Sequence, residues 1–263
     1  MKSILLLMSL CCFGGTAQAA VQGEDVDYEA DGVTLKGYLA YDNAIKGKRP
    51  GVLVVHEWWG QNKYARKRAR MLAALGYTAL AVDMYGNGKT VDNPDDAGKL
   101  AGEVYKNMPM AKARFEAAMQ LLRNQPSVQG DELAAFGYCF GGGIALNMAR
   151  MGEDLKGVAS FHGGLGTGNP AQPGTIKARI VSFSGDADPT IGPDKVAAFR
   201  KEMDAAGANY RVVIYPGAKH AFTNPDADVM GKKFNMPIAY DAKADKDSWE
   251  QATKFLREVF AGK

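Results

Sequence analysis

One cysteine lies in a setting that is typical of an enzyme nucleophile. The segment from Gly137 to Gly141 reads G-Y-C-F-G, has Cys139 at its centre and follows an apolar run. This spacing predicts a sharp turn from a strand into a helix, in which side chains at the two outer positions would collide, so both are glycine. The thiol then lies at the helix N-terminus, whose dipole favours a thiolate. We therefore predict that Cys139 is a nucleophile rather than an inert buried cysteine.

A nucleophilic thiol needs a base, and the base needs a carboxylate that orients it. Two histidines follow Cys139 in the chain. His220 lies in a loop after the last predicted strand, which is the expected place, whereas His162 ends the strand that comes directly after the cysteine. Between them, the segment S-G-D-A-D-P offers two acids. The G-x-x-D spacing favours Asp188 as the partner of His220 and leaves Asp186 to shape the turn.

Backbone donors and a second carboxylate are expected beside the thiol. An oxyanion hole needs two N–H groups, and we assign them to Phe140 and to Trp58 in the segment H-E-W-W-G, which follows the first central strand. Glu57 ends the same strand and could hold the S–H of Cys139, which would keep the resting thiol protonated; a structural ion pair is the alternative. Trp59 is expected to wall an apolar substrate pocket, although core packing is equally open to it.

The elements that must position these residues alternate along the chain. Apolar runs predict strands at residues 26–29, 33–41, 51–56, 77–82, 133–138, 157–161, 180–184 and 210–215. Helical spacing predicts helices at 62–75, 92–107, 109–123, 141–151, 193–206 and 247–260. Such alternation indicates an α/β fold with a mostly parallel central sheet and helices on both faces. The stretch 223–246 is predicted to be a long irregular loop, and such loops are often functional.

Composition and charge exclude several classes of protein. Of the 263 residues, 46% are hydrophobic and 23% are charged, which excludes a disordered, collagen-like or coiled-coil chain. A net charge of +3 gives no reason to expect nucleic acid as a partner. No C-x-x-C spacing suggests a zinc site. The sequence says nothing about oligomeric state.

The first nineteen residues are predicted to be a secretory signal peptide. Lys2 precedes an apolar run at 4–13, and A-Q-A at 17–19 is a small-x-small cleavage signal. Residues 20–263 then form a single α/β domain, and no later stretch is apolar enough to span a membrane. Cleavage removes Cys11 and Cys12, so Cys139 stands alone and forms no internal disulfide. We expect a bacterial periplasmic or secreted protein.

Together these segments resemble the dienelactone hydrolase family of the α/β-hydrolase fold. The resemblance rests on G-Y-C-F-G-G, His56-Glu57, Gly185-x-x-Asp188 and His220-x-Phe222, and it extends over nearly the whole chain after the signal peptide. It implies a Cys-His-Asp triad that opens a lactone or ester through an acyl-enzyme, a glutamate that gates the thiol, and neither a metal nor an organic cofactor.

The sequence departs from that family where a substrate carboxylate would bind. The resemblance implies arginines in two stretches that should line the pocket, one with Tyr85 and Asn87 and one with Phe222 and Asn224, and asparagine stands at both places. A neutral amide cannot give the bidentate clamp of a guanidinium. We therefore expect a substrate other than dienelactone. If a clamp exists, the first basic residues to consider are Arg66, Lys89 and Lys219.

Two functions remain open at this point. The first is a secreted cysteine hydrolase that acts on a small ester or lactone, with thioester or peptide substrates not excluded. The second is a non-catalytic relative that binds a small molecule or a protein partner. The presence of Cys139, Asp188, His220 and Glu57 together favours the enzyme, because a binding module has no need of all four.

Overall fold

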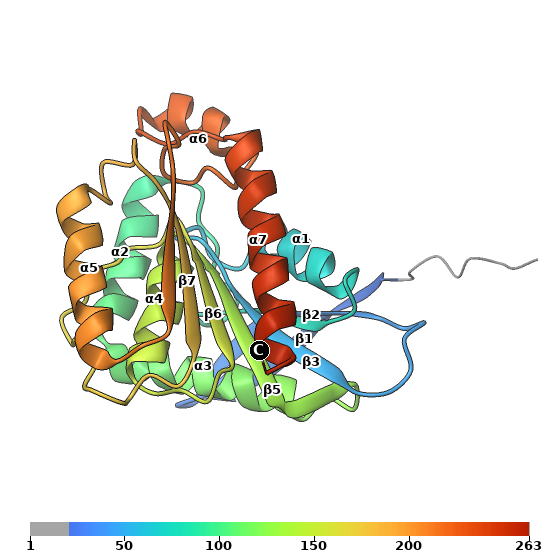
Figure 1. Cartoon of the computed structure of the whole chain (residues 1–263). Coiled ribbons are helices and arrows are strands. Elements are labelled where there is room, and N and C mark those ends of the chain that lie inside the picture. The colour runs from blue at the N-terminus through green and yellow to red at the C-terminus, as the bar shows by residue number, and fades with distance from the viewer. Residues whose placement is uncertain (1–20, 263) are drawn as a thin grey trace, which may run out of the picture.

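Eight strands form one sheet in the order β1-β2-β4-β3-β5-β6-β7-β8 (Figure 1). The computed structural model describes residues 21–262, so the predicted signal peptide lies outside the described part of the chain. The strands are β1 (Val21–Ala30), β2 (Val33–Asp42), β3 (Arg49–Val55), β4 (Thr78–Val82), β5 (Val128–Tyr138), β6 (Gly157–Phe161), β7 (Arg179–Gly185) and β8 (Tyr210–Tyr215). All neighbours from β4 to β8 pair in parallel, whereas β1 with β2 and β2 with β4 are antiparallel. The predicted mostly parallel sheet is thus confirmed.

Helices cover both faces of this sheet. They are α1 (Lys63–Ala73), α2 (Pro94–Lys106), α3 (Met108–Arg123), α4 (Phe140–Arg150), α5 (Pro193–Ala206), α6 (Ala227–Phe234) and α7 (Ala242–Phe260). Helices α1 and α7 pack on one face, and α2 to α5 pack on the other (Figure 1). In the described residues no helix combines the length and the apolar character that a membrane crossing requires.

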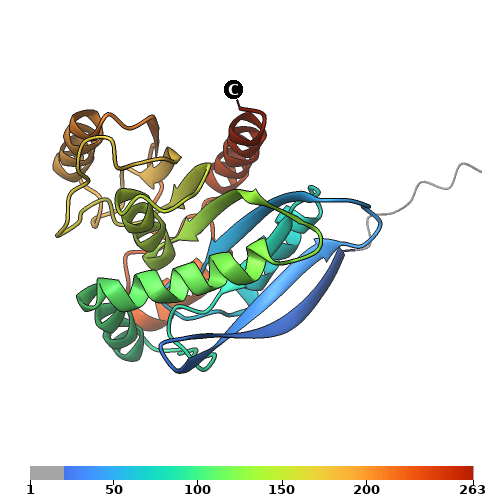
Figure 2. The same cartoon turned by 90° about the horizontal axis from the view of Figure 1, so that it is seen from below.

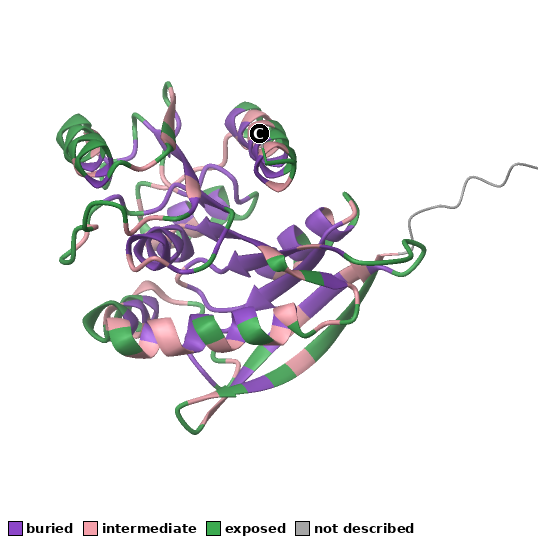
Figure 3. Cartoon of the chain, turned by 60° about the horizontal axis from the view of Figure 1, so that its bottom comes forward, coloured by how far each residue is buried: buried purple, intermediate pink, exposed green. Residues whose placement is uncertain are grey.

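Burial on both faces explains why the central strands are apolar throughout. In β3, Val52 and Val54 face the α1/α7 layer, while Leu53 and Val55 face the other layer. Successive side chains of a strand point to opposite faces, so a strand covered on both sides needs apolar residues at every position. Figure 3 shows the contrast between these buried strands and the outermost strand β1, which is mostly exposed and in which less exposed residues recur at every second position only from Val26 to Ala30.

The long hairpin of β1 and β2 forms one edge of the sheet (Figure 2). Its turn is Asp31-Gly32, and both residues have positive φ, of 51° and 73°. This is the conformation that a two-residue hairpin turn requires and that an Asp-Gly pair favours. The hairpin is confirmed, although β1 begins at Val21, five residues before the predicted start.

The prediction of an irregular loop at 223–246 is wrong, because this stretch contains α6 and the first turn of α7. Gly231 in the middle of α6 lowers helix propensity and weakens the sequence signal. Tertiary packing explains the glycine, since a Cβ there would come within 2.7 Å of the Ile238 carbonyl oxygen. Helix α7 begins at Ala242, where the Asp241 side chain accepts hydrogen bonds from two backbone N–H groups of the first turn.

The carboxyl ends of the parallel strands meet at one edge, where α6 also lies (Figure 1). Glu57 comes just after β3, Cys139 after β5, His162 after β6, Asp188 after β7 and His220 after β8. In open α/β sheets this edge is where ligand sites form. The topology therefore gathers residues that are far apart in the sequence.

Candidate active site

Cys139 lies at a strained turn between β5 and α4. Its φ of 53° and ψ of −116° are unusual for any residue other than glycine. Crowding explains the flanking glycines: a Cβ at Gly137 would come within 2.1 Å of the Gly141 carbonyl oxygen, and one at Gly141 within 2.3 Å of the Val55 carbonyl oxygen. The predicted sharp turn is present, and it leaves the thiol partly exposed at the start of α4.

Cys139, His220 and Asp188 form a continuous chain of contacts. The Sγ atom of Cys139 lies 3.0 Å from Nε2 of His220, and Nδ1 of His220 lies 2.7 Å from Oδ2 of Asp188. The other oxygen of Asp188 accepts hydrogen bonds from the N–H and the hydroxyl of Thr190. Asp186 instead accepts a hydrogen bond from the N–H of Gly217, in the turn before His220. The structure thus gives the two acids different partners.

The electrostatic interactions among Cys139, His220 and Asp188 favour a charged His220 and a charged Asp188. Burial opposes a charged imidazole, but the Cys139 thiolate and the hydrogen bond to Asp188 outweigh it and raise the pKa of His220 well above its ordinary value. Burial also opposes the charged form of Asp188, yet its hydrogen bonds to His220 and Thr190 lower the pKa of this carboxyl. His220 can therefore hold a proton next to the sulfur while Asp188 stays ionised.

The backbone N–H groups of Phe140 and Trp58 remain candidates for an oxyanion hole. Among the described residues, neither group donates a hydrogen bond to another part of the protein. Groups next to them do form hydrogen bonds. The Gly141 N–H donates to the His56 carbonyl, and Tyr85 Oη donates to the carbonyl of Trp58 at 2.8 Å. Both segments are therefore fixed by neighbouring hydrogen bonds. Trp58 also lines the cavity beside the thiol, whereas Phe140 is buried and is not one of the lining residues.

The expected contact between Glu57 and the thiol is not made. The Glu57 carboxylate is buried and accepts a 2.6 Å hydrogen bond from the side-chain amide of Asn224, whereas the sulfur faces His220. Burial raises the pKa of Glu57 to about 7, although the Asn224 hydrogen bond partly opposes the shift. A predominantly apolar surrounding favours the neutral acid, which explains the direction of this shift.

An apolar cavity of about 320 Å³ opens beside the thiol. Its wall comes from the loops after β3, β7 and β8 and from the α6 region. The lining residues are Glu57, Trp58, Trp59, Cys139, Pro189, Thr190, His220, Ala221, Asn224, Ala227, Met230, Met236, Pro237 and Ile238. Of the five residues predicted for the pocket, Trp59 and Asn224 are present. The tryptophan pair was therefore a useful signal.

Three predicted pocket residues lie elsewhere. Tyr85 is buried behind the site, with its ring against His56 and Phe140. Phe222 is fully buried and packs on the α1/α7 side of the sheet. Asn87 is exposed in a turn, has a φ of 56° and donates its backbone N–H to Thr34 on strand β2. The carboxylate of Asp83 fixes this turn by accepting N–H groups from residues 85, 86 and 88, so Asn87 lies outside the cavity wall.

None of the basic residues considered as a clamp lines the cavity. Arg66 forms an ion pair with Asp25 and stacks on the ring of Tyr38. Lys89 and Lys219 are absent from the cavity wall, which contains no lysine or arginine of the described chain. Nothing in this cavity can therefore form the bidentate clamp that a substrate carboxylate would need.

Sequence reasoning missed the wall that α6 supplies. Met230 belongs to α6, and Met236 and Ile238 follow it in a segment that pairs with the His220 loop. The Ala239 N–H donates to the His220 carbonyl, and the Asp241 N–H donates to the Phe222 carbonyl. The apolar residues Met236 and Ile238 were the available signal in the sequence for this part of the wall. Their pairing with the His220 loop could not be predicted, because the two segments are not neighbours in the sequence.

Among the described residues, no three or more His, Cys, Asp or Glu side chains are arranged so that they could hold a metal ion. The chemistry that the arrangement can supply is that of a thiol, an imidazole and a carboxylate in contact. This set performs nucleophilic attack on an electrophilic carbon, with the imidazole moving the proton.

Comparison with known proteins identifies the family of this chain. Residues 35–260 match the dienelactone hydrolase family. "Protein usf" of Aquifex pyrophilus is 30% identical over 240 residues, which cover 90% of this chain and 98% of that protein. "Probable 2-oxo-3-(5-oxofuran-2-ylidene)propanoate lactonase" of a Bradyrhizobium species is 29% identical over 248 residues, which cover 90% of this chain and 95% of that protein.

A solved structure agrees in both fold and extent. A dienelactone hydrolase-like promiscuous phosphotriesterase from metagenomic libraries superimposes with a TM-score of 0.84 and 33% identity, covering 91% of this chain and 98% of that one. The family match begins within β2 and covers every later strand and all the site residues described above. This chain belongs to the dienelactone hydrolase family and is a carboxylic ester hydrolase with the α/β-hydrolase fold.

Proposed function

We propose that this protein hydrolyses neutral carboxylic esters or lactones through a thioester on Cys139. The observation that carries the proposal is the 3.0 Å contact between Cys139 Sγ and His220 Nε2 at the wall of an apolar cavity. A non-catalytic role is disfavoured, because a binding site gains nothing from a strained cysteine next to an oriented imidazole.

The reaction follows from the positions of these atoms. His220 takes the thiol proton, and the sulfur attacks the carbonyl carbon, which forms a C–S bond and moves an electron pair to the carbonyl oxygen. We assign the stabilisation of this oxyanion to the N–H groups of Phe140 and Trp58, for which the described residues show no other hydrogen-bond acceptor. Its collapse breaks the C–O bond, and His220 gives its proton to the leaving alcohol. Water, deprotonated by His220, then attacks the thioester carbon; the C–S bond breaks, the acid is released, and His220 returns the proton to the sulfur of Cys139.

Asp188 keeps His220 in the tautomer that this sequence needs. With Nδ1–H donating to the carboxylate, Nε2 faces the sulfur and can accept its proton. The negative charge of Asp188 also stabilises the imidazolium that forms.

The cavity favours neutral substrates. Its wall is mainly apolar, and the one acid in it, Glu57, repels an anion whenever it is ionised. An anionic ester would enter without a lysine or arginine partner, so its carboxylate would lose hydration without compensation. This supports a neutral ester or lactone as substrate and disfavours dienelactone, which carries a carboxylate.

The same cavity supports a second candidate activity on neutral phosphotriesters. The structural relative described as a promiscuous phosphotriesterase is similar along nearly its whole length. A triester is uncharged and needs no cationic clamp, so the absence of lysine and arginine from the wall is no obstacle. Release of nitrophenol from a dialkyl 4-nitrophenyl phosphate, with loss in Cys139→Ala, tests this activity.

We also propose that the enzyme is exported, on the evidence of the signal-like segment at residues 1–19. Export would separate it from cytoplasmic intermediates and would leave Cys139 as the one thiol of the mature chain. Fractionation of the native host, followed by mass spectrometry of the N-terminus, tests this proposal: it expects a chain that begins at Ala20 in the periplasm or medium.

The decisive experiment on the chemistry replaces the nucleophile. Cys139→Ala should lower the rate of 4-nitrophenyl ester hydrolysis by several powers of ten, because members of a triad act as a unit. Cys139→Ser puts a hydroxyl in the place of the thiol and should retain a trace of activity. A thioester trapped on Cys139 and detected by mass spectrometry supports the covalent route, whereas wild-type activity in the Ala variant refutes it.

A further inference from the structure

A fully buried histidine outside the triad contacts the backbone of the nucleophile. His162 follows β6 and has a φ of 41°, a left-handed conformation that is uncommon for residues other than glycine. Its Nδ1 lies 3.1 Å from the backbone nitrogen of Cys139, whose N–H is shared with the Phe161 carbonyl at 2.9 Å. The strained backbone of Cys139 is therefore held by two acceptors from β6 and its end.

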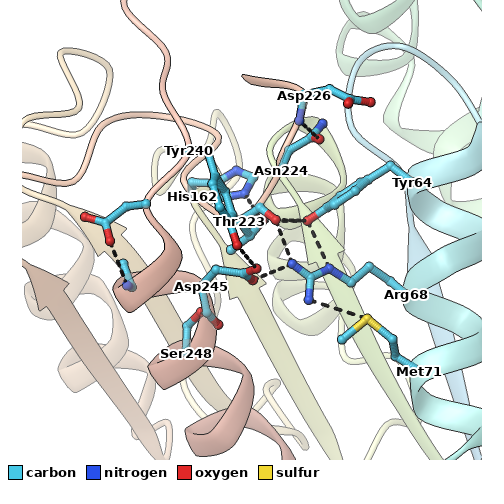
Figure 4. A network of polar contacts seen from close by, with 12 residues as sticks. Tyr64, Arg68, Met71, His162, Thr223, Asn224, Asp226, Tyr240, Asp245 and Ser248 are labelled. Atoms are coloured by element: carbon cyan, nitrogen blue, oxygen red, sulfur yellow. Dashed lines mark hydrogen bonds and ion pairs between the residues drawn. The ribbon is translucent and has the colours of Figure 1, made fainter. Parts of the chain in front are cut away.

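The other ring nitrogen of His162 connects the nucleophile to the loop that carries His220. Nε2 lies 2.7 Å from the hydroxyl of Thr223, three residues after His220 (Figure 4). That hydroxyl lies 2.6 Å from the hydroxyl of Tyr64 on α1, which accepts a hydrogen bond from Nε of Arg68. Arg68 also donates to the Thr223 carbonyl at 2.7 Å and to Asp245 at the start of α7.

The two ends of this network fix where the proton of His162 resides. An amide N–H can only donate, so Nδ1 must accept from Cys139 and the ring proton must be on Nε2. A neutral histidine carries one donor and one acceptor nitrogen, which matches these two contacts. Arg68 can only donate, so Arg68 and the Nε2–H of His162 both donate toward the two hydroxyl groups between them. The Thr223 hydroxyl can then donate to Tyr64, and the Tyr64 hydroxyl to the Thr223 carbonyl, 3.2 Å away.

Electrostatics keep this ring neutral beside a charged one. Burial, together with the positive charges of His220 and Arg68, holds the pKa of His162 well below its ordinary value. The two imidazoles are 5.3 Å apart, centroid to centroid, in an edge-to-face arrangement. His220 can thus carry the proton during the reaction without competition from His162.

We propose that His162 is a positioning residue, which holds the backbone of Cys139 through Nδ1 and couples it to the His220 loop through Nε2 and Thr223. The proposal rests on the proposed cysteine chemistry and adds to it a tie between nucleophile and base. The nearby triad contact is a single 3.0 Å approach, so a small displacement of either backbone would lengthen it. Misplacement of about 1 Å can cost about a hundredfold in rate.

Asparagine and glutamine at position 162 separate the two contacts. The Asn side-chain oxygen replaces Nδ1 as the acceptor for Cys139, and asparagine tolerates a positive φ. The longer Gln reaches toward Thr223 but leaves the Cys139 N–H without its ring acceptor. Thr223→Val removes the acceptor of Nε2–H and preserves side-chain shape, and Tyr64→Phe removes only the next hydroxyl and serves as the matched control.

The test measures kcat, KM and the melting temperature of these variants with a 4-nitrophenyl ester. We expect His162→Gln, which loses the acceptor for Cys139, to lower kcat by about a hundredfold with KM changed less than about threefold. His162→Asn and Thr223→Val both keep that acceptor and lose the contact between positions 162 and 223, so each should lose about tenfold, and Tyr64→Phe should lose less than about threefold. A general loss of packing would not separate Asn from Gln at similar melting temperatures.

Equal kcat in His162→Asn and His162→Gln overturns the proposal, as does a Thr223→Val variant with wild-type kcat. If His162→Gln fails to fold, the comparison of Thr223→Val with Tyr64→Phe decides. Cys139→Ala distinguishes the two levels: an active Ala variant refutes the cysteine chemistry itself, whereas an inactive Ala variant combined with a fully active His162→Gln refutes only the role of His162.

Discussion

The side-chain amide of Asn224 donates a 2.6 Å hydrogen bond to the carboxylate of Glu57 inside the cavity that holds Cys139. This pairing leaves a buried acid with a neutral partner in place of a cation. His220, Arg68 and Asp226 are the charged groups that act on it from a distance, and burial remains the dominant influence. The acid is therefore costly to ionise in the folded protein.

A pH dependence of stability follows from this cost. The pKa of Glu57 is about 7 in the folded protein and 4.5 as the ordinary value, so folding takes up a proton between these values and stability falls as pH rises through this window. Glu57→Gln removes the titration. Relative to wild type, its free energy of unfolding should rise by about 2–3 kcal/mol between pH 5 and pH 8.

Urea unfolding of both proteins at the two pH values measures this difference. Glu103→Gln on α2 is the control, because that side chain is exposed and stays in water in both states. Parallel pH profiles for wild type and Glu57→Gln would contradict the prediction.

The two aspartates after β7 should differ sharply in their effect on rate. Asp188→Asn removes the charge that orients His220 and should lower kcat by about three to four powers of ten. Asp186→Asn keeps an oxygen that can accept the Gly217 N–H, so its loss should be less than about tenfold. Steady-state kinetics on one ester measures both, and a more damaging Asp186 variant would reverse the assignment.

The lack of a cationic clamp predicts a preference for neutral substrates. Hydrogen bonds to charged groups contribute about 1.5–3 kcal/mol each, so two missing contacts correspond to about two to four powers of ten in kcat/KM. A neutral aryl or alkyl ester should therefore exceed dienelactone in kcat/KM, measured on one preparation. A tenfold advantage for dienelactone would mean that a basic group outside the observed cavity wall reaches the substrate.

Helix α6 should determine selectivity for the apolar part of the substrate. Met230 lines the cavity, whereas its neighbour Val229 is 67% exposed. Met230→Ala should lower kcat/KM for a butyl-chain ester by about tenfold and for an acetyl ester much less, because one lost apolar contact is worth about 1–3 kcal/mol. Val229→Ala is the matched control and should change neither value. The prediction fails if both variants respond alike to chain length.

Much of the site was determined by local sequence. The elbow around Cys139 requires glycines two residues away on either side, and this crowding acts over a five-residue segment. Strand ends could also be located, since a strand buried on both faces must be apolar throughout. Parallel strands bring their carboxyl ends together, so Cys139, Asp188 and His220 could be placed at one edge before the structure was known.

Side-chain direction and the cavity wall were decided only by the tertiary structure. Tyr85 and Phe222 stand next to site segments in the sequence, but the sheet directs them into its two core layers. Asn224 contacts Glu57 across 167 positions of sequence, and His162 meets Thr223 across 61. No short-range pattern encodes such contacts, because they arise where separate strands end side by side. Helix α6 was missed for the same reason: its glycine is unfavourable in an isolated helix and is required by the close approach of Ile238.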